Sequence, residues 1–178
     1  MPSISYNGEI FTESAPIAWL IADAYPAQLV PPSNTSGGPQ RRARIAFFVD
    51  TFFTKFQSGV TKLFAAKTDD EADPIIEAAV DQLVKELEPL LKDAKPFFGG
   101  SDKITLAEVL TGPFLIRLIT LSKAGIYPSK LSSSIAKRAP NFWKWAETVA
   151  AQPSVTSIFN EEKIIASAKA RIAKARGS

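Results

Sequence analysis

Ile104-Thr-Leu-Ala-Glu-Val109 is the stretch of this sequence that decides the fold. Thr105 and Glu108 have the spacing of a capping box, in which each side chain accepts a hydrogen bond from a backbone N–H at the start of a helix. An apolar run follows and extends to about Lys123. The stretch therefore predicts a helix that begins at Thr105, and it indicates a structural role for Thr105 and Glu108.

Helical patterns fill the chain on both sides of this stretch. Upstream, the segment from Arg41 to Ala66 carries Phe48, Phe52 and Phe56 at a spacing of four residues, which is typical of one buried helix face. We assign these three Phe side chains to the core or to a dimer interface, with the wall of a substrate site as the alternative. Further helices are expected from Asp73-Pro74 to about Ala94, from Ser132 to Lys137, from Pro140 to Ala151, from Pro153 to Phe159 and from Asn160 to about Arg176.

The first residues follow a different pattern. Asn7-Gly8 stands between two short β-prone runs, and Asn-Gly is a strong signal for a β-hairpin because both residues tolerate positive φ. Ser14 is a predicted N-cap for a helix that reaches about Ala24. The segment from Pro26 to Pro39 contains four Pro and two Gly, so it is expected to be a linker.

Composition excludes several kinds of chemistry. The 178 residues contain no Cys and no His, which excludes disulfides, Cys/His zinc sites and Ser-His-Asp triads. We expect no metal. With 46% hydrophobic and 22% charged residues, the chain has the composition of a globular protein.

Neither a membrane nor a nucleic acid is an expected partner. The N-terminus lacks a signal-peptide pattern, and the most apolar stretch is too short to span a bilayer. We therefore expect a cytoplasmic protein. The net charge is only +3. The basic residues of the C-terminal tail have no aromatic residues between them, which is typical of a solvated helix face and not of a nucleic-acid-binding surface.

Several motifs in this order resemble the glutathione transferase family. The Glu13-Ser14 pair that opens a helix after a hairpin is similar to the second half of the family's thioredoxin-like domain. The helical part adds further matches: Leu87-Glu-Pro-Leu-Leu91, Phe97-Phe-Gly-Gly100, the capping box, Trp145 and Pro153-Ser-Val155. The resemblance covers essentially the whole chain, and fungal-type branches of the family are the most similar.

The resemblance implies a mainly α fold in three parts. Residues 1–25 correspond to part of a thioredoxin-like α/β domain (a β-hairpin plus a helix), residues 26–40 to a linker, and residues 41–178 to the all-helical C-terminal domain. The family's first β-α-β-α portion has no counterpart here. That portion carries the Tyr, Ser or Cys that contacts the glutathione sulfur, so we assign no catalytic residue and expect it upstream of Met1.

The resemblance also implies a glutathione-binding site made of Met1, Pro2, Glu13 and Ser14. Ser14 and nearby backbone N–H groups would hold the γ-glutamyl carboxylate, and Glu13 would hold the ammonium. Pro2 would follow a cis peptide bond, which exposes the backbone of Met1 to the cysteinyl part of glutathione. The alternative for Glu13 and Ser14 is a surface charge and a simple helix cap.

Two functions from different classes remain open. The first is a glutathione transferase, a homodimer that transfers the glutathione thiolate to an apolar electrophile in detoxification; the present chain alone would be inactive. The alternative is a non-catalytic glutathione-transferase-like module for assembly or regulation. In the family the nucleophile is the thiol of bound glutathione. A chain without Cys or His is compatible with that mechanism.

Overall fold

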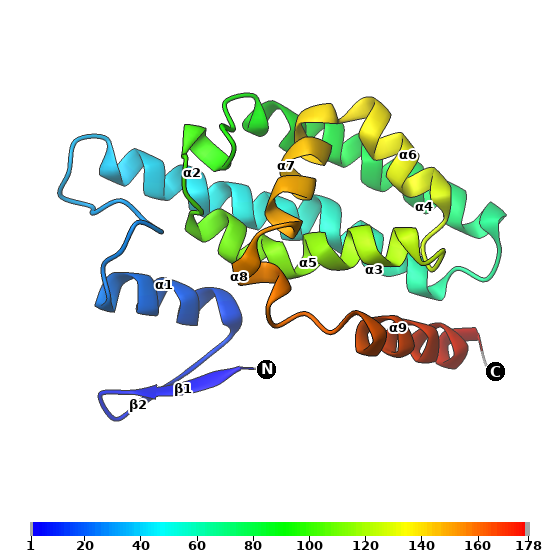
Figure 1. The fold of residues 1–178 in the computed structure, drawn as a ribbon, viewed down its shortest axis with the longest axis horizontal. Coiled ribbons are helices and arrows are strands. Elements are labelled where there is room, and N and C mark those ends of the chain that lie inside the picture. The colour runs from blue at the N-terminus through cyan, green and yellow to red at the C-terminus, as the bar shows by residue number, and fades with distance from the viewer. Residues whose placement is uncertain (1, 177–178) are drawn as a thin grey trace.

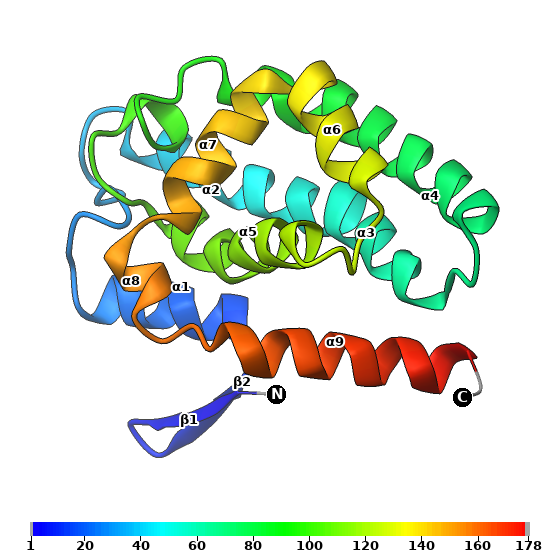
Figure 2. The same cartoon turned by 45° about the vertical axis from the view of Figure 1, so that its right-hand side comes forward.

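The computed structural model describes residues 2–176, and it consists of a small hairpin-and-helix unit beside a larger helical body (Figures 1 and 2). The first unit comprises β1 (Ser3–Tyr6), β2 (Glu9–Thr12) and α1 (Ser14–Ala24). The principal helices of the body are α2 (Gly38–Thr51), α3 (Ser58–Lys62), α4 (Asp69–Gln82), α5 (Leu106–Lys123), α6 (Ser129–Arg138), α7 (Pro140–Ala150), α8 (Pro153–Thr156) and α9 (Glu161–Arg176). Within these described residues, no helix is long and apolar enough to cross a membrane.

The hairpin is confirmed. β1 and β2 pair antiparallel, with Ser3 opposite Thr12 and Tyr6 opposite Glu9. Asn7 and Gly8 form the turn with φ values of 52° and 85°, as a two-residue hairpin turn requires. This register places Pro2 and Glu13 at the same end of the hairpin, since they flank the paired residues Ser3 and Thr12.

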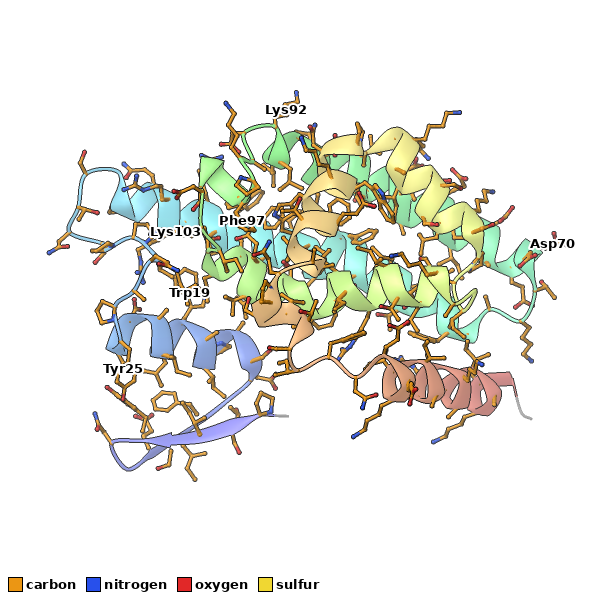
Figure 3. All side chains as sticks on the ribbon, viewed as in Figure 1. Trp19, Tyr25, Asp70, Lys92, Phe97 and Lys103 are labelled. Carbon is orange, nitrogen blue, oxygen red and sulfur yellow. The ribbon has the colours of Figure 1, made fainter. Side chains whose placement is uncertain are left out.

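The small unit is held against the body by α1. Trp19 lies between α1 and the helical body (Figure 3) and packs against the core. The guanidinium of Arg42, from α2, stacks 5.1 Å from the centroid of the Trp19 ring. The same guanidinium donates hydrogen bonds to both carboxylate oxygens of Asp23, at 2.8 and 3.0 Å. One arginine thus fixes α1 through a cation–π contact and a forked ion pair.

α2 begins at Gly38, three residues earlier than the predicted start at Arg41. Pro39, which counted toward the linker, lies in the first turn of the helix, where a residue without an N–H loses no bond. Gly38 is required by a close approach, because a Cβ there would lie 2.1 Å from the carbonyl oxygen of Pro32.

α2 continues into α3 through the π-helical turn η1 (Phe52–Gln57), which the sequence did not predict. A π turn holds one more residue than an α turn. Phe48, Phe52 and Phe56 all have 0% relative exposure. Their core assignment is confirmed, and neither a dimer interface nor a substrate wall can be formed by these three side chains.

α4 also begins earlier than predicted. Its N-cap is Thr68, whose hydroxyl oxygen accepts a hydrogen bond from the backbone N–H of Glu71. Asp73-Pro74 was the wrong start, because Pro74 lies inside the helix. The helix changes into the π turn η3 (Leu83–Leu87) and then the 3₁₀ turn η4 (Glu88–Leu91), and Pro89 lies in the first turn of η4.

The capping box of α5 is confirmed, and Glu108 also accepts hydrogen bonds from residues outside the cap. Its Oε2 accepts hydrogen bonds from the backbone N–H and the hydroxyl of Thr105, at 2.9 and 2.7 Å. Its Oε1 accepts from the backbone N–H of Phe98 and from the indole Nε1–H of Trp145, both at 2.8 Å. Glu108 is 1% exposed. One buried carboxylate therefore joins the loop before α5, the start of α5 and the middle of α7.

We predict that Glu108→Ala lowers the free energy of unfolding by about 3 kcal/mol or more, because several buried donors lose their acceptor at once. Urea denaturation would measure the change. Glu147→Ala is the matched control: Glu147 is an exposed residue of α7, and its removal should change stability by about 0.5 kcal/mol or less. Equal effects of the two substitutions would contradict the role given to Glu108.

Candidate functional site

The residues expected to bind a ligand gather where β2 meets α1. Glu13 and Ser14 are consecutive at this junction, and the hairpin register brings Pro2 to the same end. All three side chains are exposed. Met1 lies outside the described residues, and so does the expected cis bond between Met1 and Pro2.

Glu13 has an unusual backbone conformation. Its φ is 71° and its ψ is 136°. Among the described non-glycine residues only Asn7, in the hairpin turn, also has positive φ, and Asn tolerates that region well. A glutamate held in this conformation costs about 1–3 kcal/mol, and such strain is concentrated at functional sites.

The N-cap of α1 is Glu13, so the prediction that Ser14 caps the helix was wrong. Ser14 is the first helical residue, and no side chain caps α1. The reason is the backbone of Glu13, whose positive φ turns the chain directly into the helix. Within residues 2–176, the Ser14 hydroxyl has no hydrogen-bond partner, and it remains available to a ligand.

The N-terminus of α1 has free backbone donors that could bind an anion. The first intrahelical bond runs from the N–H of Ile17 to the carbonyl oxygen of Glu13, at 3.2 Å. The N–H groups of Ser14 and Ala15 have no acceptor in the described part of the chain, and Pro16 has no N–H. The first turn carries no acidic residue, and the acidic N-cap residue Glu13 makes no side-chain cap hydrogen bond, so these N–H groups keep their capacity to bind an anion at the positive end of the helix dipole.

Glu13 adds the opposite charge beside this anion site. It forms no ion pair with the described residues, so its carboxylate is free to accept hydrogen bonds from a cation. A free carboxylate next to free N–H and O–H donors matches a ligand that carries an ammonium and a carboxylate on one carbon. The side chains here offer binding and orientation, and none is placed as an acid, base or nucleophile.

Residues 2–176 contain no group of three or more His, Cys, Asp or Glu side chains that could hold a metal ion.

Comparisons with known proteins bear on the fold. No protein-family model matches the sequence, and no curated protein matches it. One similar structure is a rice glutathione transferase solved in complex with glutathione. The match covers 98% of this chain and 76% of the rice chain, with a TM-score of 0.72 and 22% identity. Another is glutathione transferase Omega 2C from Trametes versicolor. The match covers 95% of this chain and 70% of the Trametes chain, with a TM-score of 0.69 and 23% identity.

This chain has the glutathione transferase fold. A third structure of this fold, a trimeric glutathione transferase from Leishmania, matches 96% of this chain and 37% of its own, with a TM-score of 0.68 and 20% identity. The mainly helical architecture with part of a thioredoxin-like domain is thereby confirmed.

The strain at Glu13 can be measured. We predict that Glu13→Gly stabilises α1 against local unfolding by about 1 kcal/mol relative to Glu13→Ala, because Gly alone is unstrained at positive φ. Amide hydrogen exchange of α1 would report the difference. Glu9 in β2 has ordinary φ, so Gly should be less stable than Ala at that control position. If the Gly variant were less stable than the Ala variant at position 13 as well as at position 9, Glu13 would be unstrained.

Tyr127 gives a pH-dependent prediction. Burial raises its pKa from 10.0 to about 12, partly offset by the positive charges of Arg171 and Arg117. Between pH 10 and 12 the unfolded chain loses the phenolic proton while the folded chain keeps it. Stability should therefore fall as pH rises through this range, by about 1.4 kcal/mol per pH unit from this group.

Urea denaturation across this alkaline range would measure the fall. Tyr127→Phe should remove this part of the slope. Tyr25→Phe is the control, because Tyr25 is 67% exposed. Identical slopes in the two variants would contradict the assignment.

Proposed function

We propose that the β2–α1 junction binds the γ-glutamyl end of glutathione, and that the protein is a glutathione transferase in which this chain supplies that half of the site. The observation that carries the proposal is the strained Glu13 beside the unpartnered Ser14 hydroxyl and the free N–H groups of Ser14 and Ala15. The fold supports it, since the rice structure with this fold holds glutathione.

Each group has one role in the proposed complex. The Ser14 hydroxyl and the N–H groups of Ser14 and Ala15 donate to the α-carboxylate of the γ-glutamyl group. The Glu13 carboxylate accepts from its ammonium. The backbone at Met1 and Pro2 pairs with the cysteinyl residue, a role that rests on the family resemblance.

The reaction would use the thiol of the ligand. The glutathione thiolate attacks an electrophilic carbon of an apolar substrate, and a thioether bond forms while the leaving group departs or the acceptor takes a proton. We assign thiol activation to no described residue. Tyr127 cannot take the thiol proton as a base, since burial raises the pKa of its hydroxyl to about 12. We further expect a cytoplasmic homodimer.

Nuclear magnetic resonance on the 178-residue chain tests this proposal. Because only half of the site is assigned to these residues, we expect millimolar affinity, without thermal stabilisation by micromolar glutathione. Millimolar S-methylglutathione should shift the amide resonances of Ser14 and Ala15. Ser14→Ala and Glu13→Gln should each weaken the effect about tenfold, the usual loss for a hydrogen bond to a charged group.

Ser5→Ala and Glu9→Gln are the matched controls, since both residues are exposed in the same hairpin. They should leave the shifts unchanged. S-methylglutathione acetylated on its amine should bind more weakly to the unmodified chain, because Glu13 then meets no ammonium. Unperturbed Ser14 and Ala15 resonances would refute glutathione binding and favour the alternative, a non-catalytic assembly module.

A further inference from the structure

α1 connects the hairpin to the helical body, and Figures 1 and 2 both show it lying between them. The position of the β2–α1 junction therefore depends on how α1 is held. The face of α1 that packs against the core of the body includes Ala15, Ala18 and Ala22 besides Trp19. Helices interlock when side-chain ridges fit into grooves. Alanine offers only a methyl group as a ridge, so these alanine contacts fix the rotation of α1 weakly.

Arg42 supplies the polar contacts between the small unit and the body. Within residues 2–176, its bonds to Asp23 are the only hydrogen bonds and the only ion pair between these two parts. Exposed ion pairs ordinarily contribute little to stability. This pair is forked, however, and the Arg42 side chain is only 22% exposed. Its guanidinium also stacks on Trp19 and donates a hydrogen bond to the carbonyl oxygen of Pro31 at 3.4 Å, so it is fixed from several sides.

Arg42 holds α1 at two points along one face. Trp19 and Asp23 are four residues apart, and Ala15 stands a further four residues toward the N-terminus. Residues at this spacing lie above one another on one side of a helix. Contact at two of these positions fixes both the rotation of α1 about its axis and its displacement along that axis. An arginine of α2 thereby sets the direction of the N–H groups of Ser14 and Ala15.

The strained backbone of Glu13 shows what these contacts resist. Glu13, whose φ is 71°, is the joint between β2 and α1. A residue keeps an unfavourable φ only when the surrounding structure holds it there. A rotation of α1 would let this φ relax, and it would also turn the N–H groups of Ser14 and Ala15 away from the Glu13 carboxylate.

We propose that Arg42 is a positioning residue for the ligand site at the β2–α1 junction. It touches no ligand and acts through Trp19 and Asp23. These contacts hold α1 in the rotation that keeps Glu13 at positive φ and keeps the free N–H donors of α1 beside the Glu13 carboxylate. The ligand role of Arg42 rests on the proposed glutathione site, whereas its effect on the backbone of Glu13 does not.

Amide hydrogen exchange tests the effect on Glu13 without a ligand. In the otherwise unmodified chain, amides of α1 should exchange more slowly in Glu13→Gly than in Glu13→Ala, because only Gly is unstrained at positive φ. In the Arg42→Met background α1 is free to rotate and position 13 relaxes, so this difference should disappear. A difference that persists in Arg42→Met would overturn the proposal, and so would its absence from the chain that keeps Arg42.

Arg44→Met is the matched control. Arg44 is likewise an arginine of α2 with one carboxylate partner, Asp93, and one stacked ring, Phe98, but neither partner belongs to α1. The difference between Glu13→Gly and Glu13→Ala should persist in this background. Its loss there would show a general effect of α2 and refute the role of Arg42.

Asp23→Asn breaks the forked pair from the other side, at an exposed side chain of α1. This variant keeps the shape of the residue and leaves Arg42 in place, so it does not depend on how a truncated arginine packs. It should also reduce the difference in exchange at position 13. An unreduced difference would contradict the role given to the pair.

Titration with S-methylglutathione, followed through the amide resonances of Ser14 and Ala15, tests the ligand role. Arg42→Met should weaken binding about fivefold, which is within the range for residues that act on a site through others. Arg42→Lys should weaken it less, because Lys keeps a charge opposite Asp23 but lacks the fork. Arg44→Met should change the affinity less than twofold.

Failure of the positioning role and failure of the glutathione site give different results. Equal affinities of Arg42→Met and the unmodified chain would refute the positioning role and leave the proposed site intact. No binding to the unmodified chain would refute that site, and the ligand role of Arg42 with it. The exchange comparison would still decide whether Arg42 holds Glu13 in its strained conformation.

Discussion

The buried carboxylate of Glu108 is the interaction on which the helical body depends. It accepts hydrogen bonds from Phe98, Thr105 and Trp145, which belong to three separate segments. A buried charge is tolerated only when its hydrogen-bonding capacity is met. The position of α7 against α5 is thereby tied to the cap that starts α5, and the ring of Trp145 is held edge-on to Phe48, with the centroids 5.2 Å apart.

The same frame carries a site that combines opposite charges. At the β2–α1 junction an unsatisfied helix start and an acidic side chain stand next to each other, so the site suits a zwitterionic group. That site rests on groups that the fold leaves without partners.

Local signals in the sequence were sufficient for the hairpin and for the start of α5. Asn7-Gly8 and the Thr105–Glu108 pair each act within a few residues, and the structure agrees with both. Proline was a poorer guide, because Pro39 and Pro74 lie within helices that begin before them. Pro39 lies in the first turn of α2, where no N–H is needed. Pro74 is the sixth residue of α4, which continues past it although one intrahelical hydrogen bond is lost.

Contacts between distant segments could not be predicted. The Glu13-Ser14 pair was found from the sequence, but its cap assignment was wrong because the φ of Glu13 depends on how β2 meets α1. Arg117, Arg171 and Tyr127 were not recognised as a cluster. They are separated in the chain and carry no motif, and they meet only because α9 packs beside α5.

The π-helical turn η1 gives chain length a direct influence on a cavity of about 300 Å³ that lies among α3, α5 and α9. One extra residue in that turn shifts everything after it by about 100° around the helix axis relative to an uninterrupted α-helix. Thr61 and Phe64 follow η1, and both line the cavity. Loss of a single residue from η1 would therefore turn these side chains off the cavity wall without altering any of them. The count of residues in this segment specifies the shape of the pocket as much as their identities do.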